Sequence, residues 1–396
     1  MPGPLDGIKV LDLSAVLSGP LCATLLGDQG ASVIKVEAPG MGDILRWVGS
    51  ARAGMCGLFH VANRGKRAIV VDLSQPEGVE IIRALARDAD VVVQNFRPGV
   101  VDRMGIGYDD LRACREDIVY LSISGFGPQG PYSQKRVYDN IIQAYSGISA
   151  CQDDPESGEP GLVRQLLCDK LTSYTAAQAV TAALFARDRG ADGQHIELSM
   201  LDTAVAFLWP DAGADHILLG DDVGHQPTIG SRYNLTRYAD GWGTLTPLSD
   251  SEFQGMCRAF GLPEVAEDPR FGTLMQRMQN ADALTEIFVA LTDKAAGMTM
   301  ADADQRLCDE DVPSGIVRSL DELPEDPQVV ANETFSISEH PVAGRLRETR
   351  PAPRFHGTPA RAGGPAPVLG QHTDEILREL GLGERIEALR SAAVVA

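Results

Sequence analysis

Hydrophobic runs alternate with amphipathic stretches along the first two hundred residues of the chain. Six short stretches, most of them apolar runs, predict strands, and they lie at 8–14, 31–39, 67–74, 90–96, 117–124 and 193–199. Between these runs, apolar residues recur at helical spacing, most regularly at 76–89 and 169–190. Because strands that alternate with helices form parallel sheets covered on both faces, the pattern predicts an α/β fold with a mostly parallel sheet.

The pattern changes after about residue 210. A hairpin is predicted around Asp240-Gly241 and helical periodicity follows it, so residues 225–325 are expected to form a smaller α+β domain. The Pro-, Gly- and Arg-rich stretch 343–366 predicts an irregular linker, after which the pattern returns to helix. The expected organisation is a large domain over 1–210, the small domain, and a C-terminal part over 330–396.

Composition and charge narrow the range of partners. The 396 residues are 44% hydrophobic and 23% charged, which is typical of a globular protein, and the formal net charge is −20. Nucleic acids and membrane surfaces attract basic proteins, so neither is expected as a partner. Seven cysteines occur without a C-x-x-C pair, so no disulfide framework and no metal site is expected. Since neither a signal peptide nor a membrane-spanning run is recognised, we expect a cytoplasmic protein.

The stretch SISGFGPQGPY at 122–132 contains the pattern G-x-G-x-x-G. A dinucleotide-binding fingerprint needs these glycines on the first strand-to-helix turn, a helix starting at the third glycine, and an acidic residue about 20 positions later. Here Pro128 and Pro131 interrupt the segment, no helical period starts before about Tyr138, and the glycines follow a late strand. We therefore predict no nicotinamide cofactor.

Several blocks, in order along nearly the whole chain, resemble the class III CoA-transferases. They include LDGIKVLDLSAVLSGPLCATLLGDQGASVIKVEAPG, NRGKRAIVVDLSQPEG, ADVVVQNFRPGVVDRMGIGYDDL and YLSISGFGPQGPYSQKRVYDNIIQAYSG. The family contains formyl-CoA transferase, the carnitine CoA-transferases and α-methylacyl-CoA racemase. The resemblance implies a Rossmann-like large domain to which the C-terminal part returns, a small middle domain, and an interlocked homodimer of two chains threaded through each other.

The resemblance identifies Asp169, in LLCDKLTSY, as the catalytic nucleophile. In the family, this carboxylate attacks the thioester of an acyl-CoA to give an anhydride, which CoA thiolate converts into an enzyme–CoA thioester. Since the exchanged bonds are already activated, the reaction implies CoA as a substrate and no metal. Asp169 comes just before the long predicted helix, where backbone N–H groups and the helix dipole are expected to keep it ionised. Cys168 is expected to be a buried packing residue.

Two other activities stay open beside CoA transfer. The racemase branch of the family uses a His just before an Asp as a second acid/base, and this chain has Tyr138 before Asp139. A phenol with an ordinary pKa of about 10 is a poor base at neutral pH, which disfavours an acyl-CoA racemase or epimerase. A non-catalytic CoA-binding protein is the remaining alternative. Tyr138 is expected either to hydrogen-bond a substrate carboxylate or to be an aromatic core residue.

The resemblance also implies the contacts with CoA. By family position they are made by Val16, Leu17, Ala38, Val71, Leu73, Ser74, Asn95, Phe96, Arg97, Arg103, Met104 and Arg136. Leu17, Tyr138 and Asp139 are expected to surround the acyl group. Formyl-transferring members carry Gln at the position of Leu17 and Arg at that of Ala38, so we expect a larger or less polar acid than formate or oxalate. The basic run Arg64, Lys66 and Arg67 could serve either CoA or the fold.

Overall fold

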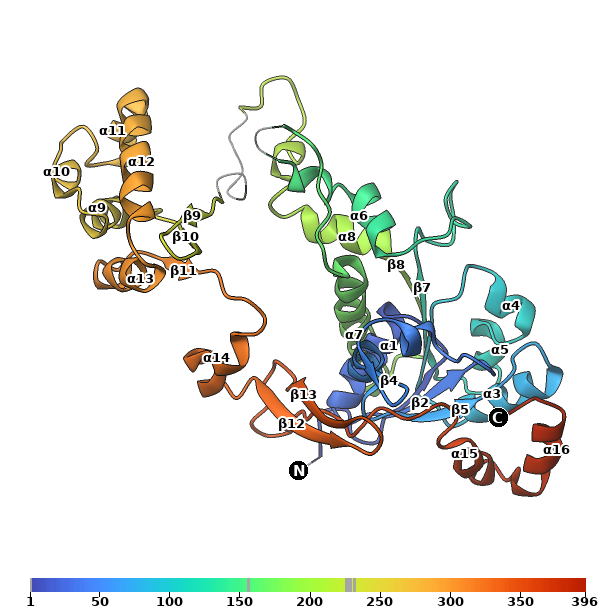
Figure 1. Ribbon diagram of the computed structural model, residues 1–396. Helices are drawn as coiled ribbons and strands as arrows, with labels where there is room; N and C mark the ends of the chain where they lie inside the picture. Colours follow the sequence, from blue (N-terminus) through green and yellow to red (C-terminus); the bar gives the residue numbers. More distant parts are fainter. Residues whose placement is uncertain (1, 155–156, 225–229, 231–232) are drawn as a thin grey trace. The chain divides into compact units, whose positions relative to one another are not determined.

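The chain divides into two compact units in a computed structural model that describes residues 2–154, 157–224, 230 and 233–396. Unit 1 comprises Met1–Pro210 together with Val330–Ala396, and unit 2 is Asp211–Val329. Unit 1 is therefore built from two segments far apart in the sequence. In Figure 1 the C-terminal helix α15 lies near strand β5, and the two elements are in contact.

Six parallel strands form the central sheet of unit 1. In spatial order they are β5 (Arg67–Val70), β2 (Ser32–Glu37), β1 (Lys9–Asp12), β6 (Val91–Gln94), β7 (Val119–Ser124) and β8 (His195–Ser199). Counted along the chain, this order is 3-2-1-4-5-6, which is the strand order of dinucleotide-binding α/β folds. It reverses between β1 and β6, and such a switch point is where open α/β sheets bind ligands, beyond the carboxyl ends of the strands.

Successive side chains of each strand point to opposite faces of the sheet, and they divide the core of unit 1 into two layers. Val10 and Val93 face a cluster made with α1 and α7, while Leu11 and Val92 face the opposite side. On that opposite face, the C-terminal helices complete the cover, because Ile376 packs into the same core as the sheet. The sheet is thus buried on both faces over its five apolar strands, as the sequence predicts, while the edge strand β8 is partly exposed.

The helices of unit 1 fall into three groups along the chain. The N-terminal segment contains α1 (Ser18–Asp28), α2 (Gly57–Asn63), α3 (Pro76–Ala86), α4 (Val100–Met104), α5 (Tyr108–Arg112), α6 (Asp139–Ser146), α7 (Leu167–Asp188) and α8 (Met200–Leu208). The C-terminal segment adds α15 (Thr373–Glu379) and α16 (Ile386–Ser391), and α14 (Pro327–Ala331) spans the division between the units. A small hairpin joins β3 (Ala51–Arg52) to β4 (Met55–Cys56).

Unit 2 combines a small antiparallel sheet with helices. Its strands are β11 (Ser314–Ile316), β10 (Trp242–Leu245) and β9 (Thr236–Arg237), in that spatial order. The helices are α9 (Asp250–Ala259), α10 (Pro263–Ala266), α11 (Leu274–Gln279), α12 (Ala281–Ala296) and α13 (Met300–Asp309). Phe253, Phe260 and Leu307 lie in a core of their own. The hairpin predicted around Asp240-Gly241 is confirmed by β9 and β10.

The structure corrects one prediction and confirms another. The segment 343–366 was expected to be an irregular linker, but it begins with β13 (Gly344–Thr349), which pairs with β12 (Phe335–His340) in an antiparallel hairpin. After β7, in contrast, no helix begins before Asp139, and Gly127 and Gly130 have positive φ angles in turns. The G-x-G-x-x-G pattern is therefore not a dinucleotide-binding turn, as predicted.

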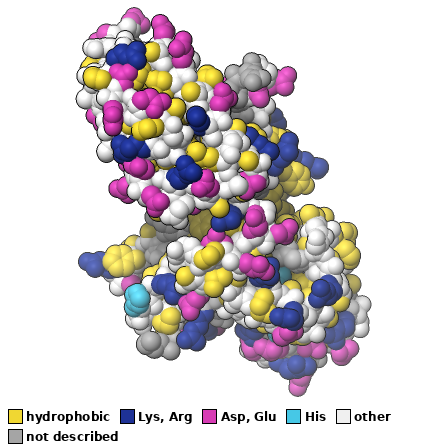
Figure 2. Space-filling view, turned by 60° about the vertical axis from the view of Figure 1, so that its left-hand side comes forward, with side chains coloured by type: hydrophobic (Ala, Val, Ile, Leu, Met, Phe, Trp, Pro, Cys, Tyr) yellow, Lys and Arg dark blue, Asp and Glu magenta, His cyan; other side chains and the backbone are white. Residues whose placement is uncertain are grey.

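The surface carries charges of both signs. Figure 2 shows Asp and Glu side chains scattered among Lys and Arg side chains over the visible face. Among the described residues, no helix combines the length and apolar character that crossing a bilayer requires.

Candidate active site

Asp169 lies in the first turn of α7, not just before it. The helix begins two residues earlier, at Leu167, so Asp169 is its third residue and no side chain caps this end. The side chain of Asp169 is buried, with 7% of the residue exposed. The structure therefore places the carboxylate inside the large unit, where water contributes little to its solvation.

Two neighbours determine the state of the Asp169 carboxylate. It accepts hydrogen bonds from the backbone N–H and the hydroxyl of Ser18, the first residue of α1. Burial, and then the nearby carboxylate of Asp139, raise the pKa of Asp169 to about 7, against the lowering effect of the Ser18 donors. Desolvation and a like charge thus oppose the stabilisation of the charged form that was expected from the start of the helix.

Asp139 is a scaffold residue and does not line the cavity described below. It is 3% exposed, and its Oδ2 accepts the backbone N–H of Asp169 at 2.9 Å. Its Oδ1 accepts from Gln143 Nε2 at 2.6 Å. Gln143 also bonds the backbone of Val163 and Gln165, the segment that leads into α7. Asp139 and Gln143 thus fix the entry to the helix that carries Asp169, whereas the sequence predicted Asp139 in the acyl pocket.

The loop that follows β1 is held by side chains from other parts of the sheet. Ser14 N–H donates to Asp12 Oδ1 at 3.0 Å, and the Ser14 carbonyl accepts from Lys35 Nζ at 2.9 Å. Ala15 exchanges two hydrogen bonds with the Asn95 side chain, of 2.9 Å and 2.7 Å. Loop backbone that would otherwise be unsatisfied in a largely buried position is thereby paired.

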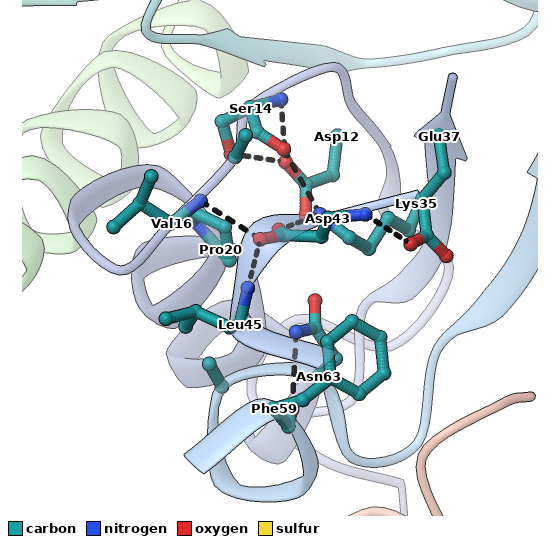
Figure 3. Close-up of polar contacts among 12 residues, drawn as sticks. Asp12, Ser14, Val16, Pro20, Lys35, Glu37, Asp43, Leu45, Phe59 and Asn63 are labelled. Carbon is teal, nitrogen blue, oxygen red and sulfur yellow. Dashed lines mark hydrogen bonds and ion pairs between the residues drawn. The ribbon is translucent and has the colours of Figure 1, made fainter. Parts of the chain in front are cut away.

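Val16, the next residue, has a left-handed backbone conformation with φ +67, which is unfavourable for a β-branched residue. Its N–H donates to Asp43 Oδ1 at 3.2 Å, and Lys35 Nζ forms a 3.0 Å ion pair with Asp43 (Figure 3). Because three successive residues of this loop are tied in place, the surrounding structure can maintain the strained conformation. The loop then leads directly to Ser18 and its contact with Asp169.

The loop rests on a cluster of buried charges. Asp12, Lys35 and Lys66 are all at most 3% exposed, and Lys66 Nζ lies 2.8 Å from Asp12 Oδ2. Burial alone would lower the pKa of Lys35, but the carboxylates of Asp12, Asp43 and Glu37 raise it. Burial lowers the pKa of Lys66 to about 8, although Asp12 opposes this shift. Both ammonium groups therefore depend on the acids around them to stay charged.

A cavity of about 260 Å³ opens in front of Asp169 at the switch point of the sheet. It receives side chains from the ends of β1, β6 and β7 and from the segment before α6. Tyr138, which is 71% exposed, lies at this cavity and not in the core. The lining includes Val16, Ser18, Asn95, Phe96, Arg97, Ser124, Lys135, Arg136, Tyr138 and Met200.

Two further cavities adjoin the first through shared lining residues. Phe96 borders both the first cavity and a second one of about 340 Å³, to which Ala38, Val71, Leu73, Ser74 and Met104 contribute. Leu73, Ser74 and Met104 also border a third cavity of about 900 Å³, which Arg103 lines. The structure thus places eleven of the twelve residues predicted to contact CoA at the linings of these three neighbouring cavities.

Leu17 is the exception among the predicted contacts. It is 4% exposed and packs with Leu45, Met55 and Phe59 in a satellite core. Its side chain cannot border the acyl group from there, so we remove it from the candidate pocket.

The sequence interpretation missed Ser18 and Lys135 and left the basic run open. Ser18 stands inside a resembling block without any chemical signal, because its role depends on the distant Asp169. Lys135 adjoins the predicted Arg136. The basic run serves the fold: Arg64 pairs with Asp28 at 2.6 Å, Lys66 with Asp12 at 2.8 Å, and Arg67 with Glu375 and Glu379 at 2.8 and 2.6 Å.

Metal ligands do not gather in the part of the chain that the structure describes. No group of three or more His, Cys, Asp or Glu side chains there is arranged to hold an ion. The seven cysteines are free, and burial raises the pKa of the Cys168 thiol to about 12. A thiol with such a pKa is a poor nucleophile, which disfavours Cys168 and leaves Asp169 as the candidate reactive group.

Comparison with known proteins decides the family. The family described as CoA-transferase family III matches residues 5–373 of the chain. The chain belongs to this family. It is 34% identical to a succinate–glutarate CoA-transferase of Agrobacterium fabrum, over 96% of this chain and 97% of that protein. It is 33% identical to a human succinyl-CoA:glutarate CoA-transferase, over 99% of this chain and 90% of that protein.

A solved structure agrees with the sequence relatives. A CAIB/BAIF family protein from Brucella suis superimposes with a TM-score of 0.82 at 31% identity, covering 96% of this chain and all of that one. This chain is thus a CoA-transferase enzyme. The family predicted from the sequence blocks is confirmed. Members of this family act on an acyl-CoA and a carboxylic acid, and CoA is their substrate.

Proposed function

We propose that the protein transfers CoA from an acyl-CoA thioester to a free carboxylic acid through covalent intermediates on Asp169. A carboxylate oxygen of Asp169 attacks the thioester carbonyl carbon, the C–S bond breaks, and CoA leaves as a thiolate. The product is a mixed anhydride between Asp169 and the acyl group. The thiolate then attacks the Asp169 carbonyl carbon of this anhydride, which releases the donor acid as a carboxylate.

The second half of the cycle reverses these steps with the acceptor acid. Its carboxylate attacks the Asp169–CoA thioester, and thiolate leaves to give a new anhydride. The thiolate then attacks the carbonyl of the acceptor, so the new acyl-CoA departs and the Asp169 carboxylate is regenerated. No electron is transferred, and no proton is gained or lost over the cycle.

The observation that supports this mechanism is the pairing of Asp169 with Ser18. A buried carboxylate with a pKa of about 7 faces a cavity and can be ionised near neutral pH. The N–H and hydroxyl of Ser18 converge on its oxygens, and they could stabilise the oxyanion that forms when thiolate adds to the Asp169 carbonyl. The strained Val16 loop would keep these donors in place during the reaction.

We propose C4 or C5 dicarboxylates as the acids. The relatives from Agrobacterium and human carry succinate and glutarate in their names, which motivates this choice. Arg97, Lys135 and Arg136 all line the cavity in front of Asp169 and could neutralise a second carboxylate.

The proposal includes an interlocked homodimer in the cytoplasm. Helices α7 and α8 expose the large apolar side chains Tyr174 (60%), Phe185 (64%) and Phe207 (57%), and a second copy would cover such surface. The seven free cysteines fit a reducing compartment.

Intact-protein mass spectrometry after mixing with succinyl-CoA tests the mechanism. The expected adduct on the wild-type chain has the mass of CoA less one water, and Asp169→Ala should abolish it. Asp202 is the matched control, because it is the third residue of α8 just as Asp169 is of α7. The variant Asp202→Ala should still form the adduct. If CoA binds but no acyl-CoA gives an adduct, the covalent mechanism is wrong.

Deuterium incorporation separates the remaining alternatives. Exchange at the α-carbon of an acyl-CoA without acyl exchange would indicate a racemase. CoA binding with neither reaction would indicate a binding protein.

A further inference from the structure

The cavity of about 900 Å³ lies between α3 and the C-terminal helices of unit 1. Its apolar wall is formed by Leu73 together with Leu380, Leu382 and Leu389 from the C-terminal segment. None of the sequence blocks that indicated CoA contacts includes this C-terminal wall. The cavity therefore extends beyond the residues predicted to contact CoA, and its C-terminal wall has no assigned role.

Four arginines border this cavity, and three of them form no ion pair with a carboxylate among the described residues. Arg83 is engaged, since it donates to the Gly105 carbonyl and pairs with Glu80 at 3.1 Å. Arg87, Arg103 and Arg385 are the other three. Glu77 and Glu80 also line the cavity, and their carboxylates would compete with an anionic ligand there.

The charge balance of the chain offers these three arginines many possible partners. The chain carries a net charge of −20 and has 55 acidic against 35 basic side chains, so carboxylate partners are plentiful. Some arginines of unit 1, such as Arg64, Arg67, Arg115 and Arg187, are paired with carboxylates. Others, such as Arg52, Arg112 and Arg189, form no ion pair among the described residues, but they do not border this cavity. Three guanidinium groups gathered around one cavity without such partners indicate a site for an anion from outside the chain.

The position of this cavity relative to the other two also matters. Phe96 links the cavity at Asp169 to the second cavity, and Leu73, Ser74 and Met104 link the second to the third. When the thioester of CoA lies at Asp169, the pantetheine arm and diphosphate extend away from it, and the adenosine end comes last. The third cavity is the one farthest along this series.

We infer that Arg87 and Arg385, together with Arg103, bind the 3′-phosphate of CoA. The inference rests on the proposed function, because it requires the thioester to lie at Asp169. Guanidinium groups suit this ligand, since they present paired donors to phosphate oxygens. Arg385 comes from the turn before α16, so the C-terminal segment supplies a binding group as well as covering the core.

Dephospho-CoA, which lacks only the 3′-phosphate, provides a direct test by isothermal titration calorimetry. The wild-type protein should bind CoA more tightly than dephospho-CoA. The variants Arg87→Ala and Arg385→Ala should each weaken CoA binding about tenfold, the lower end expected for a charge-assisted hydrogen bond, and leave dephospho-CoA binding unchanged. The double variant should bind the two ligands with nearly equal affinity.

Arg378→Ala is the matched control. It removes one positive charge from the same C-terminal segment, but Arg378 pairs with Asp374 at 3.6 Å and does not border the cavity. This variant should keep the wild-type preference for CoA. An equal loss of affinity for both ligands in Arg87→Ala and Arg385→Ala would overturn the inference, because it would place their contact at the diphosphate or in the general field of the protein.

The two proposals fail in different ways. If wild type binds CoA and dephospho-CoA equally but still forms the Asp169 adduct, the phosphate site is wrong and the transferase mechanism stands. If inorganic phosphate binds with an affinity that Arg385→Ala reduces while CoA binding is unaffected, the cavity serves a separate anion and the inference is again wrong. Failure to bind CoA at all would reject the proposed function itself.

Discussion

At the scale of single residues, Asp169 and Asp139 form a pair of buried carboxylates with separate tasks. Asp139 hydrogen-bonds Gln143 and the backbone of α7, whereas Asp169 faces the cavity and Ser18. Burial, and then the proximity of Asp139, raise the pKa of Asp169 to about 7, where a proposed nucleophile could be ionised under ordinary assay conditions. Asp139 thus contributes to the raised pKa of Asp169 as well as holding the start of α7.

Asp139→Asn should move the acidic limb of the pH profile of kcat/KM to lower pH. In the proposed mechanism Asp169 must be ionised to attack, and removing the neighbouring charge lowers its pKa. The asparagine keeps an oxygen that can accept the N–H of Asp169. Initial rates with succinyl-CoA and glutarate across pH 5 to 9 would measure the shift. Asp202→Asn should leave the limb in place, and an unchanged limb in Asp139→Asn would contradict the coupling.

Asp169→Asn should stabilise the fold, and more so at high pH. The pKa of Asp169 is raised by folding, from 3.8 to about 7, so the folded state is penalised increasingly as pH rises through this range and the penalty levels off above pH 7. The asparagine has no such penalty. The difference in unfolding free energy between Asp169→Asn and the wild type should be greater at pH 8 than at pH 5.5 by about 2 kcal/mol. Urea denaturation at both pH values measures it, and equal gains would contradict the raised pKa.

The residues of the site differ in how far the sequence could predict them. Asp169 could be named because it stands at a fixed place in a resembling block. Ser18 could not, because a serine near a helix start is ordinary and its partner is 151 positions away, at Asp169. The burial of Leu17 depends on α2 and its neighbours, which are also distant in sequence.

At the scale of elements, the loop between β1 and α1 is determined by charges beneath it. Lys35 on β2 pairs with Asp43 and bonds the Ser14 carbonyl, and both charged side chains are buried. A buried pair contributes little net stability, but loss of one partner leaves the other charge uncompensated. The conformation of the loop therefore depends on the presence of both Lys35 and Asp43.

Lys35→Met should cost about 3–5 kcal/mol of unfolding free energy, because Asp43 and Asp12 would remain buried without this cation. Chemical denaturation followed by circular dichroism gives the value. Lys9→Met is the control, since Lys9 forms an exposed ion pair with Asp88, and the cost there should stay below about 1 kcal/mol. Equal effects of the two variants would show that the buried cluster does not support the fold as described.

The elements themselves were predictable to different degrees. Five of the six sheet strands were found because they are largely buried and read as short apolar runs, whereas the edge strand β8 is partly exposed and its segment HIELS contains polar residues. The hairpin of β12 and β13 was missed because it is a two-stranded ribbon with one face largely in water. In GRLRET, the sequence of β13, Leu346 is the single large apolar residue. One apolar position shows neither the two-residue period of a strand nor the 3.6-residue period of a helix.

At the scale of the whole molecule, unit 2 interrupts unit 1 in the sequence. The chain leaves unit 1 at Pro210 and returns at Val330. In the proposed homodimer, threading of one chain through the other would make separation of the subunits require unfolding.

Subunit exchange tests this arrangement. Light scattering should give about twice the chain mass of 42.3 kDa. Differently tagged dimers, mixed for days, should form no hybrids by native mass spectrometry, but refolding the mixture from urea should produce them. A monomeric mass would reject the dimer, and hybrids formed without denaturant would reject the threading.

The division of unit 1 also has a consequence for its synthesis. Ile376, Leu377, Ile386 and Leu389 cover the same sheet face as Leu11 and Ile69, but they are translated after the whole of unit 2. At about 5–20 residues per second, this face waits on the order of 10–30 s on the ribosome after Pro210 is made. A nascent chain with an uncovered apolar sheet is a substrate for chaperones, and its yield should depend on them more than that of a protein whose core is contiguous.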